Sequence, residues 1–298
     1  MSATTTLELS KSTAVPMSTT TGSAVAARGS HNIALGKAHP YQLPTFEDKL
    51  KERQWMLNHM AGAFRVFSRK GYGEGTAGHI SVRDPVDPTT FWINPLGMHF
   101  GLIRASDLVH VDEHGNILDG GAQTAINAAG FAIHSALHKA NPDVNAACHT
   151  HSVYGKAYSA FGKPLEMINQ DVCSFYKSHA VYEDFGGVAV EAEEGRAIAH
   201  AIGTGKGAIL ANHGLITVGK TVDEAAYLFT LMEKSCQTQL LVDAADKGNK
   251  KIIGDKEAAS TELINGDHET LYTEFQPDYE MELRLSNNEF VLDPSKPL

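Results

Sequence analysis

The sequence predicts an α/β protein whose main domain runs from about residue 41 to residue 246. Along that stretch, segments with the apolar spacing of helices alternate with short β-branched and aromatic runs. The chain has 298 residues, of which 42% are hydrophobic and 20% charged. Such a composition is ordinary for a globular protein, and the length is sufficient to bury a large core.

The first expected helix follows Thr45, which has the character of an N-cap, and stops before Gly71. Its apolar positions are Phe46, Leu50, Leu57, Met60, Phe64 and Phe67. Short strands are expected next, over residues 78–83, 90–94 and 108–111.

A second helix is expected over about 124–140, because Asn141-Pro142 ends its apolar stripe. A buried strand over 144–150 and a helix over 152–161 follow. The next expected elements are strands at 188–190, 208–210 and 215–218, and a helix around 196–199. Thr221 and Glu224 form a capping-box pattern that opens a long helix ending near residue 246.

Both ends of the chain differ from this domain. Residues 1 to about 40 are polar and of low complexity, so we expect a disordered N-terminal arm. Residues 247–298 form an acidic C-terminal extension, with one short helix expected near Leu263.

Charge and cysteine content exclude several classes of protein. Acidic residues exceed basic ones by 35 to 25, whereas a nucleic-acid surface needs a basic footprint. Neither a membrane-spanning run nor a signal-peptide pattern is apparent. The cysteines, Cys148, Cys173 and Cys236, show no CxxC spacing, which indicates free thiols in a reducing compartment. We therefore expect a cytoplasmic protein that binds neither nucleic acid nor membranes.

The first group that could carry chemistry is His149-Thr150-His151 at the end of an expected strand. Side chains two residues apart on a strand share a face, so both imidazoles could bind one metal ion. They could equally be ordinary strand-end histidines. His213, between Asn212 and Gly214, is either a turn histidine or a third ligand that leaves one metal position open to substrate.

Three further patterns are weaker. His134 and His138 share a helix face, but Ser135 replaces the glutamate of a metalloprotease HExxH motif, which favours core or solvated histidines. The Gly-rich run 71–78 lacks the order of a nucleotide-binding loop and could at most hold a small anion or a carbonyl oxygen. Asp171 is either a buried acid near a site or a loop cap.

Taken in order, the motifs resemble those of the class II aldolase/adducin family over roughly residues 50–245. The matching segments are Gly75–Arg83, Ile93–Gly97, Phe131–His134, Asn141–Ala146, His149–His151 and Asn212–Leu215. The resemblance implies a three-layer α/β/α sandwich with a central, largely antiparallel or mixed sheet. It also implies a homotetramer, in which His149, His151 and His213 hold a divalent metal, usually zinc, with iron or manganese as alternatives.

The sequence departs from the family pattern where sugar-phosphate aldolases bind and activate substrate. The resemblance places a catalytic glutamate at position 130 and phosphate-binding serines just before it, but this chain has Ala128, Ala129 and Gly130. The family's threonine before Gly97 is Leu96, and its asparagine in the Gly-rich segment is His79. A phosphate clamp is therefore not expected.

From these departures we expect His79 and Gly97 to lie at the substrate. His134, Asp171 or a water molecule would stand in for the missing acid. The leading interpretation is a metal-dependent lyase acting on a small non-phosphorylated carbonyl or hydroxy compound. One alternative is a non-enzymatic, adducin-like protein associated with actin, and another is an Fe(II)-dependent oxygenase on the same scaffold.

Overall fold

The computed structural model describes residue 34 and residues 36–184, 192–246 and 248–293. The strand expected at 188–190 and nearly all of the expected N-terminal arm lie outside the described residues. In the part of the chain that is described, no helix combines the length and apolarity needed to cross a bilayer.

A seven-stranded sheet forms the centre of the molecule, in the order β3-β2-β1-β4-β7-β6-β5. Its strands are β1 (His79–Arg83), β2 (Phe91–Ile93), β3 (Val109–Val111), β4 (Ala146–Thr150), β5 (His179–Tyr182), β6 (Gly207–Leu210) and β7 (Gly214–Gly219). Only β5 and β6 pair in parallel, and the other neighbours are antiparallel. The sheet is therefore mixed and largely antiparallel.

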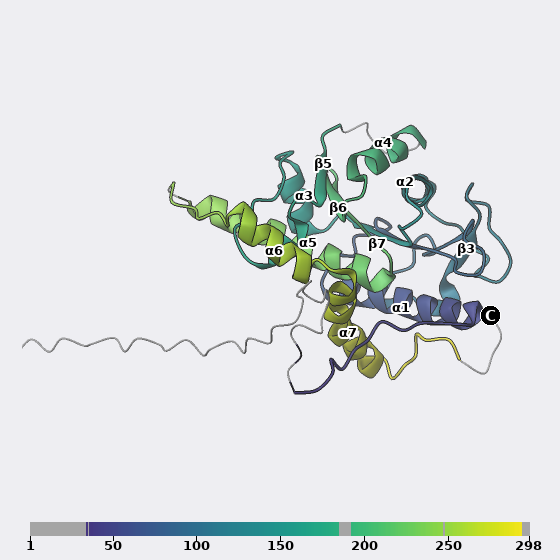
Figure 1. Cartoon of the computed structure of the whole chain (residues 1–298). Helices are drawn as coiled ribbons and strands as arrows, with labels where there is room; N and C mark the ends of the chain where they lie inside the picture. The colour runs from purple at the N-terminus through teal and green to yellow at the C-terminus, as the bar shows by residue number, and fades with distance from the viewer. Residues whose placement is uncertain (1–33, 35, 185–191, 247, 294–298) are drawn as a thin grey trace, which may run out of the picture.

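Helices cover both faces of this sheet (Figure 1). The helices α2 (Ala128–Ala140) and α4 (Ala192–Ile202) lie on one face, and α1 (Lys49–Arg69), α5 (Val222–Ala245) and α7 (His268–Leu285) lie on the other. Shorter helices complete the fold, namely α3 (Val153–Ser159), α6 (Asp255–Asn265), η2 (Phe100–Leu102), η3 (Ala105–Asp107) and η4 (Asp171–Phe175). The predicted three-layer α/β/α sandwich is confirmed.

Strand alternation decides which residues reach each layer. In β4, Ala146 and Cys148 join the core against α1 and α5, whereas Ala147 joins the core against α2 and α4. His149 follows Ala147 at a spacing of two and therefore faces the α2 layer. The larger core lies on the opposite face, where aromatic side chains such as Phe64 and Phe229 are fully buried.

Two predicted helix starts are wrong. Helix α1 begins at Lys49, because the Asp48 carboxylate accepts a hydrogen bond from the backbone N–H of Leu50 at 2.9 Å and is the N-cap in place of Thr45. Helix α2 begins at Ala128, after Asn127, whose side chain accepts from the N–H of Gly130 at 3.0 Å.

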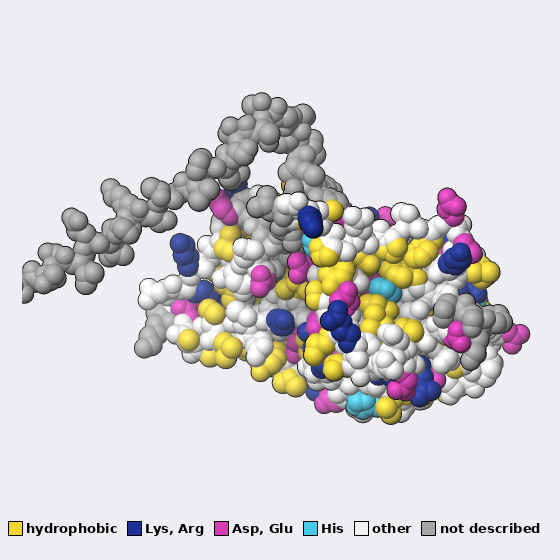
Figure 2. Space-filling model, turned by 90° about the horizontal axis from the view of Figure 1, so that it is seen from below, with side chains coloured by type: hydrophobic (Ala, Val, Ile, Leu, Met, Phe, Trp, Pro, Cys, Tyr) yellow, Lys and Arg dark blue, Asp and Glu magenta, His cyan; other side chains and the backbone are white. Residues whose placement is uncertain are grey.

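The C-terminal segment contributes to the core. The helix expected near Leu263 is present as α6. A second helix, α7, with Pro277 inside it, was not predicted. Helix α7 packs on α1 and α5 through Leu271 and Phe275, both almost fully buried. The face that α1 and α7 help to form shows Lys and Arg interspersed with Asp and Glu among hydrophobic side chains (Figure 2).

Candidate metal centre

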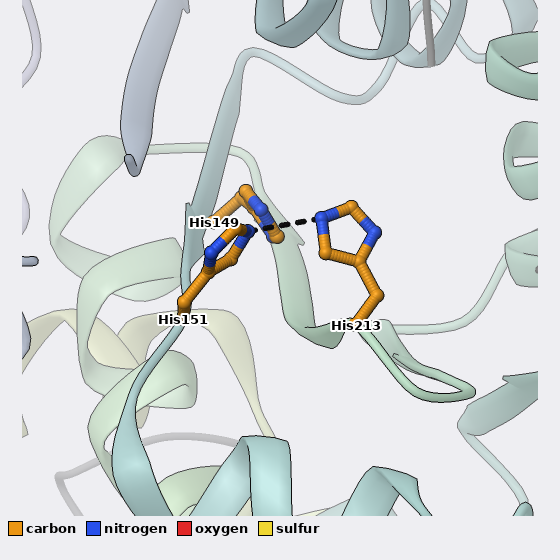
Figure 3. Close-up of side chains that lie close together, drawn as sticks. All are labelled: His149, His151 and His213. Atoms are coloured by element: carbon orange, nitrogen blue, oxygen red, sulfur yellow. Dashed lines mark hydrogen bonds between the residues drawn. The ribbon is translucent and has the colours of Figure 1, made fainter. Parts of the chain in front are cut away.

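Three histidines from two neighbouring parts of the sheet meet at one point (Figure 3). His149 lies near the end of β4, His151 follows that strand, and His213 lies in the turn between β6 and β7. Their potential ligand nitrogens all lie within 4.8 Å of one another. The structure thus brings together His149, His151 and His213, as the family resemblance implies. We call these residues the three-histidine cluster.

The turn before β7 places His213 by backbone geometry. Asn212 has a φ of +56°, a left-handed conformation that asparagine tolerates better than most residues. A Cβ on Gly214 would lie 2.9 Å from the carbonyl oxygen of Thr150, so only glycine fits this close approach between the turn and β4. The Asn-His-Gly sequence therefore holds the His213 imidazole beside the end of β4.

The nitrogens of the cluster have the arrangement that a metal ion needs. The N–H at Nδ1 of His149 donates to the carbonyl oxygen of Leu215 at 2.8 Å, which leaves its Nε2 lone pair free to bind. The Nε2 atoms of His151 and His213 lie 3.0 Å apart. Two nitrogens bound tetrahedrally at about 2.0–2.1 Å from zinc would lie roughly 3.3 Å apart, so the residues fit a divalent ion with little movement.

Burial keeps these imidazoles neutral, as metal binding requires. Removal from water lowers the pKa of His213 to about 4 and holds the pKa of His149 well below its usual range. Burial also lowers the pKa of His151, although the nearby carboxylate of Glu74 opposes this effect. Near neutral pH all three imidazoles are therefore neutral. Because the Nε2 atoms of His151 and His213 share a hydrogen bond, one of them carries a proton, which a bound metal ion would displace.

Two acidic residues that the sequence analysis did not single out support the cluster. Glu233 of α5 is buried and accepts hydrogen bonds from the hydroxyl of Ser152 and from the N–H groups of Tyr154 and Gly155, at 2.5, 2.9 and 2.6 Å. It thereby fixes the segment that follows His151. The sequence does contain a sign of this role. Glu233 comes four residues after Phe229, which places an acidic side chain on the buried face of a helix.

Glu74 is the second acid, and it lies in the Gly-rich run. Its carboxylate pairs with the ammonium of Lys156 at 2.6 Å, and both side chains are partly exposed beside His151. The pair brings one negative and one positive charge to the rim of the cluster. The ammonium of Lys156 is therefore already matched by a carboxylate.

A second row of histidines lies behind the cluster on β1 and α2. His79 is directly opposite His149 in the β1–β4 register, and their rings are stacked with centroids 6.0 Å apart. The His134 ring lies edge-on to that of His79, with centroids 5.8 Å apart. Both ring nitrogens of His79 and Nε2 of His134 are buried and have no hydrogen-bond partner among the residues that the structure describes.

Hydrogen bonds fix the tautomers of His138 and His134. The N–H at Nδ1 of His138 donates to the carbonyl oxygen of Val144 at 3.0 Å, so its Nε2 accepts from the hydroxyl of Ser81 at 2.8 Å. The Ser81 oxygen then accepts from Nδ1 of His134 at 2.6 Å. It follows that the unpartnered Nε2 of His134 is an acceptor.

The other predicted site residues lie elsewhere. Asp171 is exposed at the start of η4 and lines a small cavity with Tyr227 and Glu274, and the three-histidine cluster does not line that cavity. Gly97 lies in an exposed turn after β2, with a φ of +81°. The structure therefore does not join either residue to the cluster, and their roles stay predictions.

Comparisons with known proteins agree with this architecture. Residues 58–240 match the family described as Class II Aldolase and Adducin N-terminal domain. The Meiotically up-regulated gene 14 protein of Schizosaccharomyces pombe is 51% identical over 84% of this chain and 97% of its own length. A Streptomyces roseochromogenus protein named 4-hydroxy-3-prenylphenylpyruvate oxygenase/4-hydroxy-3-prenylbenzoate synthase is 38% identical, over 87% of this chain and 92% of that protein.

Among solved structures, L-fuculose 1-phosphate aldolase from Glaciozyma antarctica superposes with a TM-score of 0.77 and 40% identity. The match covers 84% of this chain and 97% of the aldolase. Sequence family, full-length relatives and fold thus agree, and the chain belongs to the class II aldolase/adducin family.

Proposed function

We propose that this protein is a metal-dependent enzyme that breaks or forms a carbon–carbon bond next to a carbonyl group. The observation that carries the proposal is the three-histidine cluster, whose potential ligand nitrogens all lie within 4.8 Å of one another. When bound there, a divalent ion supplies Lewis-acid chemistry to a substrate oxygen. The protein's own part is to hold the three imidazoles with one tautomer of His149 fixed by Leu215.

We propose a small non-phosphorylated carbonyl or hydroxy compound as the substrate, and specifically a 2-oxo acid. The phosphate-binding hydroxyls that the family resemblance implies are absent at Ala128, Ala129 and Leu96. Lys156, beside the cluster, is already paired with Glu74. The Streptomyces relative is named for a phenylpyruvate, which is a 2-oxo acid, whereas the Glaciozyma aldolase is named for a sugar 1-phosphate.

Metal analysis of purified protein tests the site directly. We expect near-stoichiometric zinc, iron or manganese in the wild type and at least about a tenfold loss in His149→Ala and in His213→Ala, because each removes one of three ligands. His114→Ala is the matched control, since its side chain is largely exposed and remote in sequence from the cluster. A wild type purified without chelators that holds no metal would overturn the proposal.

Substrate class is tested by turnover with the metal-loaded protein. We expect retro-aldol cleavage of a 4-hydroxy-2-oxo acid: the bond between C3 and C4 breaks, the C4 hydroxyl loses its proton to give an aldehyde, and C3 gains a proton to give a shorter 2-oxo acid. Fuculose 1-phosphate should turn over at least about a hundredfold more slowly, because the phosphate-binding hydroxyls that the family resemblance implies are absent at Ala128, Ala129 and Leu96. Preference for the sugar phosphate would contradict the proposed substrate while leaving the metal site intact.

Iron-dependent oxygenase chemistry is the second candidate, because the Streptomyces relative carries an oxygenase name. Three imidazoles suit Fe(II) as well as zinc. Oxygen consumption that requires both Fe(II) and a 2-oxo acid would favour this candidate. Equal turnover with zinc in the absence of oxygen would favour the lyase.

Two further proposals follow from the family. We propose that the chain forms a homotetramer, for which light scattering at micromolar concentration is the test. The adducin-like interpretation predicts co-sedimentation with filamentous actin and no requirement for metal. Actin binding by a metal-free wild type would favour the non-enzymatic, adducin-like interpretation over the enzyme.

A further inference from the structure

The imidazole of His79 occupies the space that a side chain on residue 130 would need. A Cβ built on Gly130 would lie 2.3, 2.4 and 2.6 Å from Cε1, Nδ1 and Nε2 of His79. Real Cβ atoms do not approach other atoms so closely, so a side chain at position 130 would force the His79 ring to move. Glycine is a poor helix former, yet Gly130 lies in the first turn of α2, where the missing side chain leaves room for the His79 ring.

Neighbouring rings hold His79 in this position. The His149 ring lies nearly parallel to it, with an interplanar angle of 16° and centroids 6.0 Å apart, and the His134 ring meets it edge-on at 85°. The β1–β4 pairing fixes the backbone of His79 directly opposite that of His149. The ring of His79 therefore has His149 and His134 as neighbours, and it lies directly against the backbone of Gly130.

The ring nitrogens of His79 lack hydrogen-bond partners in the described part of the chain. Its relative exposure is 6%, and neither ring nitrogen has a hydrogen-bond partner among the described residues. A neutral imidazole has one N–H donor and one acceptor nitrogen, and buried polar groups are normally satisfied. Two unsatisfied nitrogens stacked beside a ligand of the cluster indicate that something bound there supplies the partner.

We propose that His79 and Gly130 form one specificity-determining pair, in which the His79 ring takes the place of a side chain at position 130 and donates its N–H to an oxygen of the metal-bound substrate. The inference rests on the proposed function and deepens it, because it assigns the group that recognises the substrate. A single neutral N–H suits the planar carboxylate or keto oxygen of a 2-oxo acid. A phosphate dianion would need several donors or cations in the same place.

The fit of the pair is tested by a thermal-stability cycle that needs neither metal nor substrate. We expect Gly130→Ala to lower the Tm by several degrees in the wild type and to leave it unchanged or raise it in a His79→Ala background. Gly62→Ala is the matched control, because its Cβ would meet the Tyr279 ring at 2.4 Å within α1. That variant should destabilise both backgrounds equally. The same loss from Gly130→Ala in both backgrounds would overturn the pairing.

Substrate recognition is tested with Co²⁺-loaded protein, whose visible spectrum reports ligands that enter the metal site. Pyruvate, oxalate and inorganic phosphate are titrated as probes. We expect His79→Ala to weaken pyruvate and oxalate binding at least about tenfold with an unchanged Co²⁺ content, and His79→Gln, which keeps an N–H donor, to restore part of that affinity. His114→Ala should behave as the wild type.

The outcomes separate this inference from the proposed function. Equal probe affinities in the wild type and His79→Ala would overturn the role of His79 while the metal site stands. A wild type that binds Co²⁺ but prefers phosphate to both carboxylates would overturn the assigned substrate class. A wild type that binds no Co²⁺ would overturn the proposed function itself, and with it the substrate contact of His79.

Discussion

The position of the His213 imidazole depends on two backbone details of single residues. Asn212 adopts a φ of +56°, and Gly214 passes so close to β4 that an added Cβ would lie 2.9 Å from the Thr150 carbonyl oxygen. We expect Gly214→Ala to cost about 1–3 kcal/mol of stability, because overpacking forces the backbone apart. The same shift should move His213 and weaken zinc binding about tenfold or more.

Competition with a chromogenic chelator measures this affinity, and urea unfolding measures the stability. Asn212→Gly serves as the control, since glycine adopts a positive φ without strain. Zinc affinity in Gly214→Ala equal to that of the wild type would show that the turn does not set the ligand geometry.

Spacing in the sequence predicts only part of this site. His149 and His151 could be paired from the sequence, because strand residues two apart share a face. His213 lies 62 residues from His151, and only the antiparallel pairing of β4 with β7 brings them together. The family resemblance supplied that link, whereas the contact between His79 and Gly130 depends on a helix start and a strand register that no local pattern encodes.

Among the secondary-structure elements, α3 is the one that anchors the cluster. Its N-terminus lacks a cap from its own residues, since Ser152 makes no capping hydrogen bond to it. Glu233 of α5 replaces that cap with bonds to Tyr154 and Gly155. A buried carboxylate that receives such bonds holds the helix end and the preceding His151 in one place.

Removal of this acceptor should therefore affect both stability and metal binding. We expect Glu233→Ala to cost about 2–4 kcal/mol, because it leaves buried donors without partners. Glu233→Gln should cost less, since one amide oxygen remains to accept. Lys234→Ala, exposed on the same helix, is the control in urea unfolding and zinc titration. A loss of stability without a loss of zinc affinity in the folded variant would show that Glu233 does not position His151.

Elements were predictable where their pattern is local. Helix α5 could be placed from its Thr221 cap and apolar spacing, and the cap is confirmed by the hydrogen bond from the Glu224 N–H to the Thr221 hydroxyl at 3.2 Å. Strand β5 was missed, because it is a short edge strand whose residues are all half-buried. Among the described residues it pairs with β6 alone, so its identity as a strand is set by tertiary pairing and not by propensity.

At the scale of the whole molecule, the histidines form a layer between the sheet and α2. The layer runs from the three-histidine cluster through His79 and His134 to Ser81 and His138. One end of the layer is the three-histidine cluster, and the other end is the hydrogen bond from His138 to the carbonyl oxygen of Val144. A substitution of His138 can therefore test how protonation affects folding without changing a residue of the three-histidine cluster.

Because His138 is buried in this layer, we expect the protein to lose stability in mild acid. Burial, assisted by the Arg83 guanidinium and opposed by the bond to Val144, lowers the pKa of His138 from 6.5 to about 4. Between those values the unfolded chain binds a proton at this residue that the folded protein does not, so stability is fully present above pH 6.5 and falls as the pH decreases toward 4. The contribution of one such histidine is at most about 1.4 kcal/mol per pH unit.

Urea unfolding from pH 7.5 to 4.5 in the presence of EDTA measures the effect without bound metal. We expect the free energy of unfolding of His138→Gln to fall less steeply than that of the wild type between pH 6.5 and 4.5, because the substituted side chain does not titrate. His114→Gln, changed at an exposed histidine, should keep the slope of the wild type. Carboxylates titrate alike in all three proteins, so only the difference between variants belongs to His138. Parallel curves for the wild type and His138→Gln would show that this end of the histidine layer does not couple protonation to folding.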